Sequence, residues 1–361
     1  MARCDALIVG GGPAGSTCAR VLQNAGWTVI VADRARFPRD KVCGGWITPE
    51  VFPLLELKPA EYRATGFTFQ EITAFRTGVL GAPSIETRYA QAVSFAIRRC
   101  EFDEFLLRRS RARICDGTPV TSFSRRGDVW IVNDRIEARV IIGAGGHFCP
   151  VARHLQGRPD AVRPVIAREL EFRLDAAASS VDGEMPELYF SRDLEGYGWC
   201  VRKGQFLNVG LGRRERGDFA THVREFLAFL TSTGRAPDAA LRPWRGHAYH
   251  AFGTGVRPLV GDGVMIVGDA AGLAYPESGE GIRPAIESGR LAAQTLVDAG
   301  GRFTADDLRP YERAMRATHR PPSATPRWLQ PAVKALGRAL LQHSPAFTRR
   351  VVIDRWFLRA H

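Results

Sequence analysis

Hydrophobic residues at the start of the chain form short continuous runs, at 6–9 and 28–32, which are separated by a glycine-rich turn and a stretch with helical spacing. Continuous apolar runs of this length are typical of parallel strands that are buried on both faces. The pattern therefore predicts a β–α–β unit. Similar runs at 141–142 and 264–267 predict strands that return to the same sheet.

The pattern changes in the middle of the chain. From about 160 to 255, apolar and polar positions alternate, with tryptophan and tyrosine interspersed, which is typical of an antiparallel sheet. We therefore expect an α/β protein in which a second domain is inserted into a Rossmann domain. The expected nucleotide-binding domain consists of 1–50, 96–159 and 256–300, the expected substrate domain of 51–95 and 160–255, and the expected helical C-terminal segment of 301–361.

The first glycine-rich turn has the spacing of a dinucleotide-binding motif. Gly10 permits the tight turn from strand to helix, Gly12 lets the backbone approach a pyrophosphate, and Gly15 lets the helix pack close to the strand. Pro13 lies in the first turn of the helix, where its missing N–H costs little, and the helix N-terminus offers free N–H groups to phosphates. Asp33 ends the next apolar run, where an acid binds ribose hydroxyls. The motif predicts a bound dinucleotide, and the alternative is a glycine-rich turn in another kind of α/β protein.

A second motif follows the strand expected at 264–267. Asp269 lies in a Gly-Asp-Ala-Ala-Gly turn and offers a carboxylate to a ribityl hydroxyl. Pro276, Gly279 and Gly281 precede a helix that is expected to run from Ile282 to about 299. The N-terminus of a helix stabilises negative charge, such as the charge of a reduced isoalloxazine ring.

The two motifs, in this order and about 250 residues apart, resemble those of the glutathione-reductase-like group of FAD-dependent oxidoreductases. This group includes p-hydroxybenzoate hydroxylase, flavin-dependent halogenases and geranylgeranyl reductases. The resemblance implies one FAD and a glutathione-reductase-type FAD-binding Rossmann domain with an inserted antiparallel β-sheet substrate domain. The cofactor-binding residues that the motifs and the resemblance imply are Gly10, Gly12, Pro13, Ala14, Gly15, Asp33, Arg34, Lys41, Cys43, Gly44, Arg99, Val120, Asp269, Pro276, Gly279, Gly281 and Ile282.

Within this group, two segments look like the geranylgeranyl-reductase-like family. Residues 36–45 resemble its FPR-x-K-x-CG stretch, whose basic residues suit FAD phosphates. Arg99 begins a segment similar to its R-x-x-FD-x-x-L helix, whose arginine reaches FAD. The structural alternatives are a solvated surface charge for Lys41, an inert buried thiol for Cys43 and an exposed helix charge for Arg99.

A third segment supports the same family. Tyr197-Gly198-Trp199, followed by 208–212, resembles its Y-x-W…NVGLG region, whose aromatic residues line a cavity over the flavin. Leu194 stands where the family has a proline, and Val201-Arg202 replaces Phe-Pro. A tryptophan in the core of a strand is the alternative for Trp199. We expect the substrate pocket to include Tyr197, Trp199 and Tyr275.

The resemblance implies an enzyme that transfers a hydride from reduced FAD to a double bond of a hydrophobic small-molecule substrate. Two alternatives are a monooxygenase that hydroxylates through a flavin hydroperoxide and an electron-transfer flavoprotein that passes electrons to a quinone. Halogenation is disfavoured because no lysine lies between Lys58 and Lys203. The catalytic residues stay unassigned. Candidates for an acid or base, by their position beside the flavin motifs, are His147, Tyr197, Tyr275, Glu277 and Glu280.

The source of electrons is a separate question. Gly145 stands where single-component hydroxylases usually have an aspartate that is associated with FAD and NAD(P)H, and no second GxGxxG motif provides a nicotinamide domain. We therefore expect NAD(P)H to reduce the flavin slowly, with a ferredoxin or a flavin reductase as the donor.

Composition excludes several classes of protein. The 361 residues contain no apolar run of about 18 residues, so no membrane span is predicted. Residues 1–5 lead directly into the first expected strand, which leaves no room for a signal peptide. Seven scattered cysteines without a CxxC pair predict a reduced, cytoplasmic protein without a metal site. The net charge of +12 comes without any nucleic-acid-binding motif, so no nucleic-acid partner is expected.

The C-terminal tail is basic and apolar, with eight Lys and Arg and one acid from 320 to 361. It is expected to form a helix pair packed on the substrate domain. The alternative is an interfacial surface that lets an apolar substrate enter from a membrane or a carrier protein, which would make the protein membrane-peripheral. The apolar residues of the tail are Trp328, Leu329, Val333, Leu336, Leu340, Leu341, Val351, Val352, Ile353, Trp356, Phe357 and Leu358.

Overall fold

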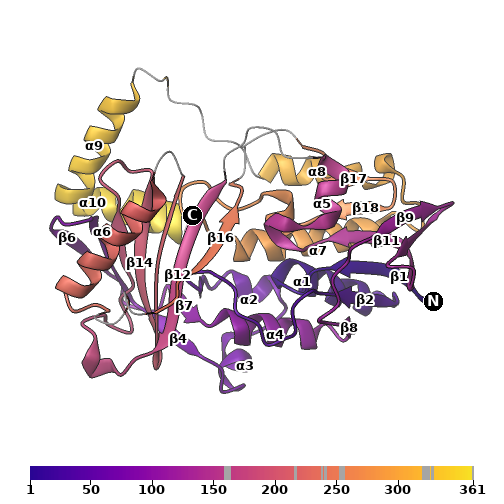
Figure 1. Ribbon diagram of the computed structural model, residues 1–361, viewed down its shortest axis with the longest axis horizontal. Coiled ribbons are helices and arrows are strands. Elements are labelled where there is room, and N and C mark those ends of the chain that lie inside the picture. Colours follow the sequence, from indigo (N-terminus) through magenta and orange to yellow (C-terminus); the bar gives the residue numbers. More distant parts are fainter. Residues whose placement is uncertain are drawn as a thin grey trace.

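Two large β-sheets organise the molecule and lie side by side in the computed structural model (Figure 1). The structure describes residues 1–157, 164–214, 218–236, 239, 242–251, 257–318, 326 and 329–359. The first sheet and its helices form the right half of Figure 1, and the second sheet and the C-terminal helices form the left half. The predicted α/β class with a separate antiparallel sheet is confirmed, whereas the exact domain boundaries stay a prediction.

The first sheet has a parallel core. Its strands are β1 (Ala2–Val9), β2 (Val29–Ala32), β8 (Arg113–Cys115), β9 (Phe123–Arg126), β10 (Val129–Val132), β11 (Ile136–Gly143), β17 (Val260–Gly261) and β18 (Val264–Ile266). Strands β18, β11, β1, β2 and β8 are parallel neighbours in this order. Strand β10 pairs antiparallel with β11, and β9 pairs antiparallel with β10. The apolar runs therefore form strands that are buried on both faces.

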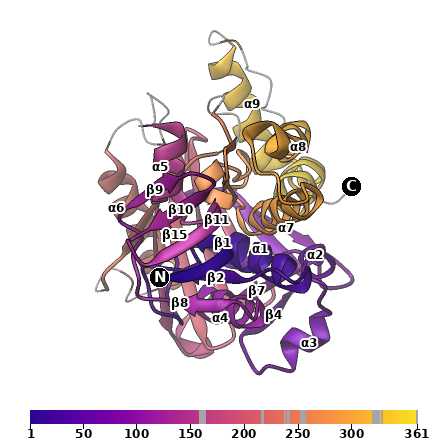
Figure 2. The same ribbon diagram turned by 90° about the vertical axis from the view of Figure 1, so that its right-hand side faces the viewer.

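Helices α1 (Pro13–Asn24), α7 (Ile282–Asp298) and α8 (Ala305–Thr318) lie on one side of this sheet, and β9 and β10 lie on the other (Figure 2). Helices α1 and α7 are in backbone contact, because a Cβ on Gly289 would collide with the carbonyl oxygen of Ala14. The two sequence motifs, which are far apart in the chain, are thus brought together. The short helix α5 (Pro150–Gln156) follows β11.

The second sheet is mostly antiparallel. In spatial order its strands are β16 (Arg245–Tyr249), β12 (Val165–Arg173), β15 (Phe206–Arg214), β14 (Gly196–Lys203), β13 (Glu187–Phe190), β5 (Ala74–Val79) and β6 (Ser84–Arg88). Only the pairing of β13 with β5 is parallel among the strand pairs that the structure describes in this sheet. Successive residues of β14 and β15 point to opposite faces of this sheet, so they pack against two different layers of side chains.

One element of this half differs from the alternation expected for 160–255. Helix α6 (Phe219–Ser232) covers one face of the second sheet, and Asp218 caps it by accepting hydrogen bonds from the N–H groups of Ala220 and Thr221. Its buried residues Val223, Phe226 and Leu230 have helical spacing, whereas strands were expected throughout this region.

A third sheet has three strands, in the spatial order β3 (Trp46–Ile47), β7 (Ser94–Ile97) and β4 (Phe69–Ile72). It packs with α2 (Val51–Leu54), α3 (Pro59–Arg63) and α4 (Arg99–Arg109) around an aromatic cluster that contains Phe52, Tyr62 and Phe102. This cluster holds the segment after β2 against the N-terminus of α4.

The C-terminal tail forms α9 (Gln330–His343), α10 (Pro345–Phe347) and a π-helical segment, Thr348–Phe357. Val352, Ile353, Phe357 and Leu358 pack in the core of the second sheet, as expected for a packed tail. Helix α9 does not bury all of its apolar residues as this segment does: Val333 is 51% exposed and Leu336 is 61% exposed. Trp328 lies outside the described residues.

All seven cysteines are free thiols. No cluster of three or more potential metal ligands occurs among the residues that the structure describes. In the same part of the chain, no helix combines the length and the apolar character that crossing a membrane requires.

Candidate active site

A cavity of about 830 Å³ lies between the two large sheets, at the upper end of the range for ligand pockets. Most of the predicted cofactor residues line it, although they come from distant parts of the sequence. Those on its wall are Gly10, Gly12, Pro13, Ala14, Asp33, Arg34, Lys41, Cys43, Gly44, Arg99, Val120, Asp269, Gly279, Gly281 and Ile282. Tyr197 and Trp199 line it as well, whereas Gly15, Tyr275 and Pro276 do not.

The glycines at the start of α1 form a cradle without side chains. A Cβ on Gly15 would collide with the carbonyl oxygen of Gly10, so Gly15 lets α1 approach β1. A Cβ on Gly12 would meet only the Arg39 guanidinium, at 3.3 Å, so this position is open toward the cavity. Asp33 accepts hydrogen bonds from the N–H groups of Gly11 (2.8 Å) and Ala35 (2.9 Å) and thereby fixes the turn. The cradle fits a pyrophosphate that must approach bare backbone.

A compact group of charges surrounds Asp269. Lys41 Nζ lies 3.7 Å and His247 Nε2 lies 3.6 Å from Asp269 Oδ2, and these two nitrogens are 2.7 Å apart. Burial acts to raise the pKa of Asp269, but the hydrogen bond from His247 and the charge of Lys41 hold this pKa well below its usual value. Asp269 is therefore an anion at neutral pH and can accept a hydrogen bond from a sugar hydroxyl.

Arg99 is buried, which excludes the exposed-charge alternative. Its guanidinium makes two 2.8 Å hydrogen bonds to Asp103, a residue with no exposed surface. Arg39 also lies 3.2 Å from Asp103, so two arginines share one carboxylate. The excess positive charge at this wall of the cavity suits a phosphate or another anion.

Aromatic side chains line the other end of the cavity. Trp199 lies over Gly210, where a Cβ would collide with its ring, and its indole N–H donates a 2.7 Å hydrogen bond to Asn208. Gly198, between Tyr197 and Trp199, faces α6, because a Cβ there would collide with the ring of Phe226. The alternation of β14 thus turns both aromatic residues toward the cavity, and the glycines of 208–212 make room for Trp199.

A buried polar network supports the Cys43–Gly44 turn from below. The Cys43 N–H donates a 2.6 Å hydrogen bond to Glu169, and Lys203, which has no exposed surface, donates a 2.8 Å bond to Glu171. Burial raises the pKa of Glu169 to about 7, although Lys203 acts in the opposite direction. Burial also acts on Glu171, but Lys203 and then Arg98 lower its pKa to about 2. The network places Cys43 on the cavity wall, half-buried rather than inert in the core.

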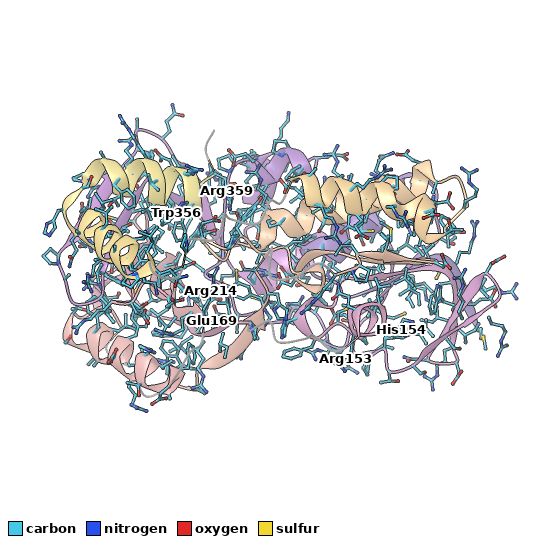
Figure 3. The ribbon with its side chains drawn as sticks, turned by 90° about the horizontal axis from the view of Figure 1, so that it is seen from above. Arg153, His154, Glu169, Arg214, Trp356 and Arg359 are labelled. Carbon is cyan, nitrogen blue, oxygen red and sulfur yellow. The ribbon has the colours of Figure 1, made fainter. Side chains whose placement is uncertain are left out.

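The end of the chain closes the cavity beside α7. Phe357 lies on the cavity wall, and its ring centroid is 5.3 Å from that of Tyr197. Arg359 forms a 2.9 Å ion pair with Glu277 and lies 3.6 Å from the ring centroid of Tyr275. This contact explains why Tyr275 packs behind the cavity instead of lining it. In Figure 3, Trp356 and Arg359 lie on the half that carries the second sheet, as does Glu169, whereas Arg153 and His154 lie on the other half.

Several cavity residues were missed from the sequence. Arg39 lies within the recognised 36–45 segment but was not singled out for binding. His247 and Tyr249 alternate along β16, a period-2 pattern that could have identified them. The missed residues of the wall include Arg39, Arg153, His247, Tyr249 and Phe357, and Glu169 lies behind the wall.

Comparisons with known proteins agree with this site. A family model described as an FAD binding domain matches residues 3–58. The chain is 30% identical over 336 residues to the menaquinone reductase of Mycobacterium tuberculosis H37Rv, covering 81% of this chain and 76% of that protein. It is 25% identical over 339 residues to the digeranylgeranylglycerophospholipid reductase of Methanocaldococcus jannaschii, covering 87% and 83%.

Among solved structures, a geranylgeranyl bacteriochlorophyll reductase-like protein from Thermoplasma acidophilum superposes with a TM-score of 0.71 at 21% identity, covering 95% of this chain and 88% of that one. This likeness supports the fold. Together with the glycine cradle and the Asp269 group, the sequence matches confirm FAD as the cofactor. We propose that the cradle holds its pyrophosphate, that Asp269 holds its ribityl chain, and that the aromatic end receives its reacting ring.

Proposed function

Because this chain belongs to the geranylgeranyl reductase-like family of FAD-dependent oxidoreductases, we propose that it reduces a carbon–carbon double bond in a substrate with an isoprenoid chain. Bound FAD supplies the hydride in such a reaction. The observation that carries the proposal is the aromatic end of the cavity, where Trp46, Tyr197, Trp199 and Phe357 form an apolar wall next to the N-terminus of α7. An isoprenoid chain is apolar along its length and carries isolated double bonds. It can therefore pack against this wall with a double bond inside the cavity.

The residues of the chain have separate tasks in this proposal. The aromatic side chains bind the apolar substrate and exclude water from it. The backbone N–H groups at the start of α7, next to Gly281, stabilise negative charge on the reduced ring. The glycine cradle and the Asp269 group keep the cofactor oriented toward this end of the cavity.

The test of this function uses the FAD-loaded protein, reduced without oxygen by dithionite. With a geranylgeranyl-bearing phospholipid or menaquinone, mass spectrometry is expected to show two added hydrogens per reduced double bond. NAD(P)H alone is expected to reduce the flavin slowly, and a ferredoxin or a flavin reductase is expected to restore the rate. A hydroxylated product formed in air would support a monooxygenase instead, and a quinol with an unchanged side chain would support electron transfer to quinones.

We also propose that helix α9 brings the protein to an anionic membrane surface, from which the lipid substrate enters. Val333 and Leu336 lie one turn apart and are more than half exposed, and the exposed Arg338 lies on the same helix. Arg349 and Arg350 follow on the segment that leads to Phe357 in the cavity wall. Basic residues beside exposed apolar ones are typical of helices that lie in the interface of a bilayer.

Flotation with vesicles containing anionic lipid tests this surface. Substituting Val333→Glu and Leu336→Glu together is expected to lower partitioning about tenfold or more, because each apolar side chain contributes about 1.5–3 kcal/mol on burial. Asn24→Glu, at an exposed end of α1, adds a negative charge elsewhere and is the control. Equal partitioning of the wild type and the double variant would contradict the membrane proposal.

A further inference from the structure

Glu280 has an unusual position in the aromatic end of the cavity. It lies on the cavity wall directly before α7, in a loop that is closed by hydrogen bonds from the Tyr275 N–H to the Glu280 carbonyl oxygen (2.9 Å) and from the Gly279 N–H to the Tyr275 carbonyl oxygen (2.8 Å). Carboxylate Oε1 accepts a 3.1 Å hydrogen bond from the Arg283 N–H. Oε2 is buried and has no hydrogen-bond partner within the described ranges of the chain. One oxygen is therefore anchored while the other is unpaired.

The nearby arginines do not neutralise Glu280. Arg283 makes a 2.9 Å ion pair with Glu287, and Arg359 makes its ion pair with Glu277. Burial raises the pKa of Glu280 to about 7, although the Arg283 N–H and guanidinium act to lower it. Glu280 can therefore carry a proton near neutral pH. The titratable and charged groups that face it are Tyr197 of β14, Tyr275 of the loop, Arg283 and Glu287 of α7, and Arg359 of the C-terminal segment.

The other candidates for an acid are engaged elsewhere. The Tyr197 hydroxyl donates to the carbonyl oxygen of Ser278, and burial raises its pKa well above the usual value, so it is a weak acid. Glu277 and Tyr275 are held by Arg359. His147 lines the cavity and its Nδ1 has no hydrogen-bond partner among the described residues, but its ring packs against Phe148 and His250. Burial lowers the pKa of His147, so its protonated form is scarce at neutral pH. Of these five residues, only Glu280 combines a place at the aromatic end with a free oxygen.

We propose that Glu280 is the catalytic acid that protonates one carbon of the substrate double bond. This inference rests on the proposed double-bond reduction. Glu280 Oε2 would give its proton to one carbon as the π electrons of the double bond form the first C–H bond, and the electron pair of the second C–H bond would come from the hydride that reduced FAD supplies when bound. The products are a saturated C–C bond, oxidised FAD and the Glu280 carboxylate, which solvent reprotonates.

Single-turnover experiments on the dithionite-reduced, FAD-loaded protein test this role. The wild-type rate with a geranylgeranyl-bearing phospholipid is expected to fall as the pH rises through about 7, because the acid form of Glu280 is lost. Glu280→Gln should react about 10²–10⁴-fold more slowly and without this pH dependence. Glu280→Asp keeps a carboxyl group and should recover part of the rate. Glu50→Gln makes the same chemical change at an exposed residue outside the cavity and should keep the wild-type profile.

A second measurement does not depend on activity. A carboxyl group whose pKa is raised by folding destabilises the folded state once it ionises, so this destabilisation is absent below the unfolded-state pKa and grows as the pH rises toward about 7. The stability of Glu280→Gln relative to the wild type, measured by denaturant unfolding, should therefore increase between about pH 5 and 7. The exposed Glu50→Gln should show no such increase.

The possible outcomes separate the two proposals. A Glu280→Gln protein that reduces the double bond at the wild-type rate with the wild-type pH profile would overturn the role of Glu280 alone. A wild-type protein that reduces none of the lipid double bonds would overturn the proposed function and the role of Glu280 together. If Glu280→Gln fails to fold, Glu280→Asp decides: a rate and pH profile unchanged from the wild type, although its carboxyl group is withdrawn by one methylene, would contradict a direct proton transfer.

Discussion

Replacing the buried Lys203 with methionine is expected to lower the free energy of unfolding by about 3–5 kcal/mol, because it leaves the partly buried Glu171 without its closest cation. The exposed Lys58→Met is the matched control and should change stability by about 0.5 kcal/mol or less. Denaturant unfolding at neutral pH measures both. A loss below about 1 kcal/mol for Lys203→Met would contradict this expectation. It would mean that Arg98, which also pairs with Glu171, is sufficient by itself to stabilise the carboxylate charge.

The pH dependence of this effect has a definite sign. Folding lowers the pKa of Glu171, with Lys203 as the main favourable partner, to about 2. A carboxylate with a depressed pKa stabilises the folded state above its unfolded-state pKa, and this contribution is lost as the pH falls toward its folded-state pKa. The stabilities of the wild type and Lys203→Met should therefore converge in acid and differ most at neutral pH.

Gly15→Ala is expected to damage the fold and FAD binding together. The added methyl group would collide with the Gly10 carbonyl oxygen, so α1 would have to move away from β1, at a cost of about 1–3 kcal/mol or more. Because the same movement displaces the glycine cradle, the purified protein should lose most of its FAD.

Gly12→Ala is the matched comparison for that variant. Its methyl group would meet only the flexible end of Arg39, so the apoprotein should keep its stability while the side chain obstructs the pyrophosphate. Thermal unfolding of the two apoproteins, followed by titration with FAD, separates the effects. Equal stability of Gly15→Ala and the wild-type apoprotein would contradict the packing argument.

The first half of the fold could be predicted because its determinants are local. A continuous apolar run, a tight turn at Gly10 and a close helix contact at Gly15 all lie within one β–α–β unit. The second motif was recognisable for the same reason. Their meeting in space depends on the contact of Gly289 with Ala14, which local sequence spacing does not show.

The parts of the site that were missed depend on tertiary contacts. His247 approaches Lys41 across some 200 residues of sequence, and Glu169 acquires its role only because Cys43 lies above it. Tyr275 lies beside the motif but is not on the cavity wall, because it packs against Arg359 of the C-terminal segment, a contact that the sequence does not show. Helix α6 was not predicted because it lies between strands whose apolar residues alternate, and its short helical spacing does not stand out from theirs.

The order of strands in the first sheet has a consequence for biosynthesis. Strand β11 pairs with β1 along one edge, but its other edge at Ile141–Gly143 waits for β18, which is translated more than 100 residues later. On the ribosome, the nascent chain therefore exposes an apolar strand edge while β12 to β16 of the second sheet are being made, and such edges are prone to aggregate. Because α7 is also translated after the second sheet, the complete FAD site exists only once α7 has emerged.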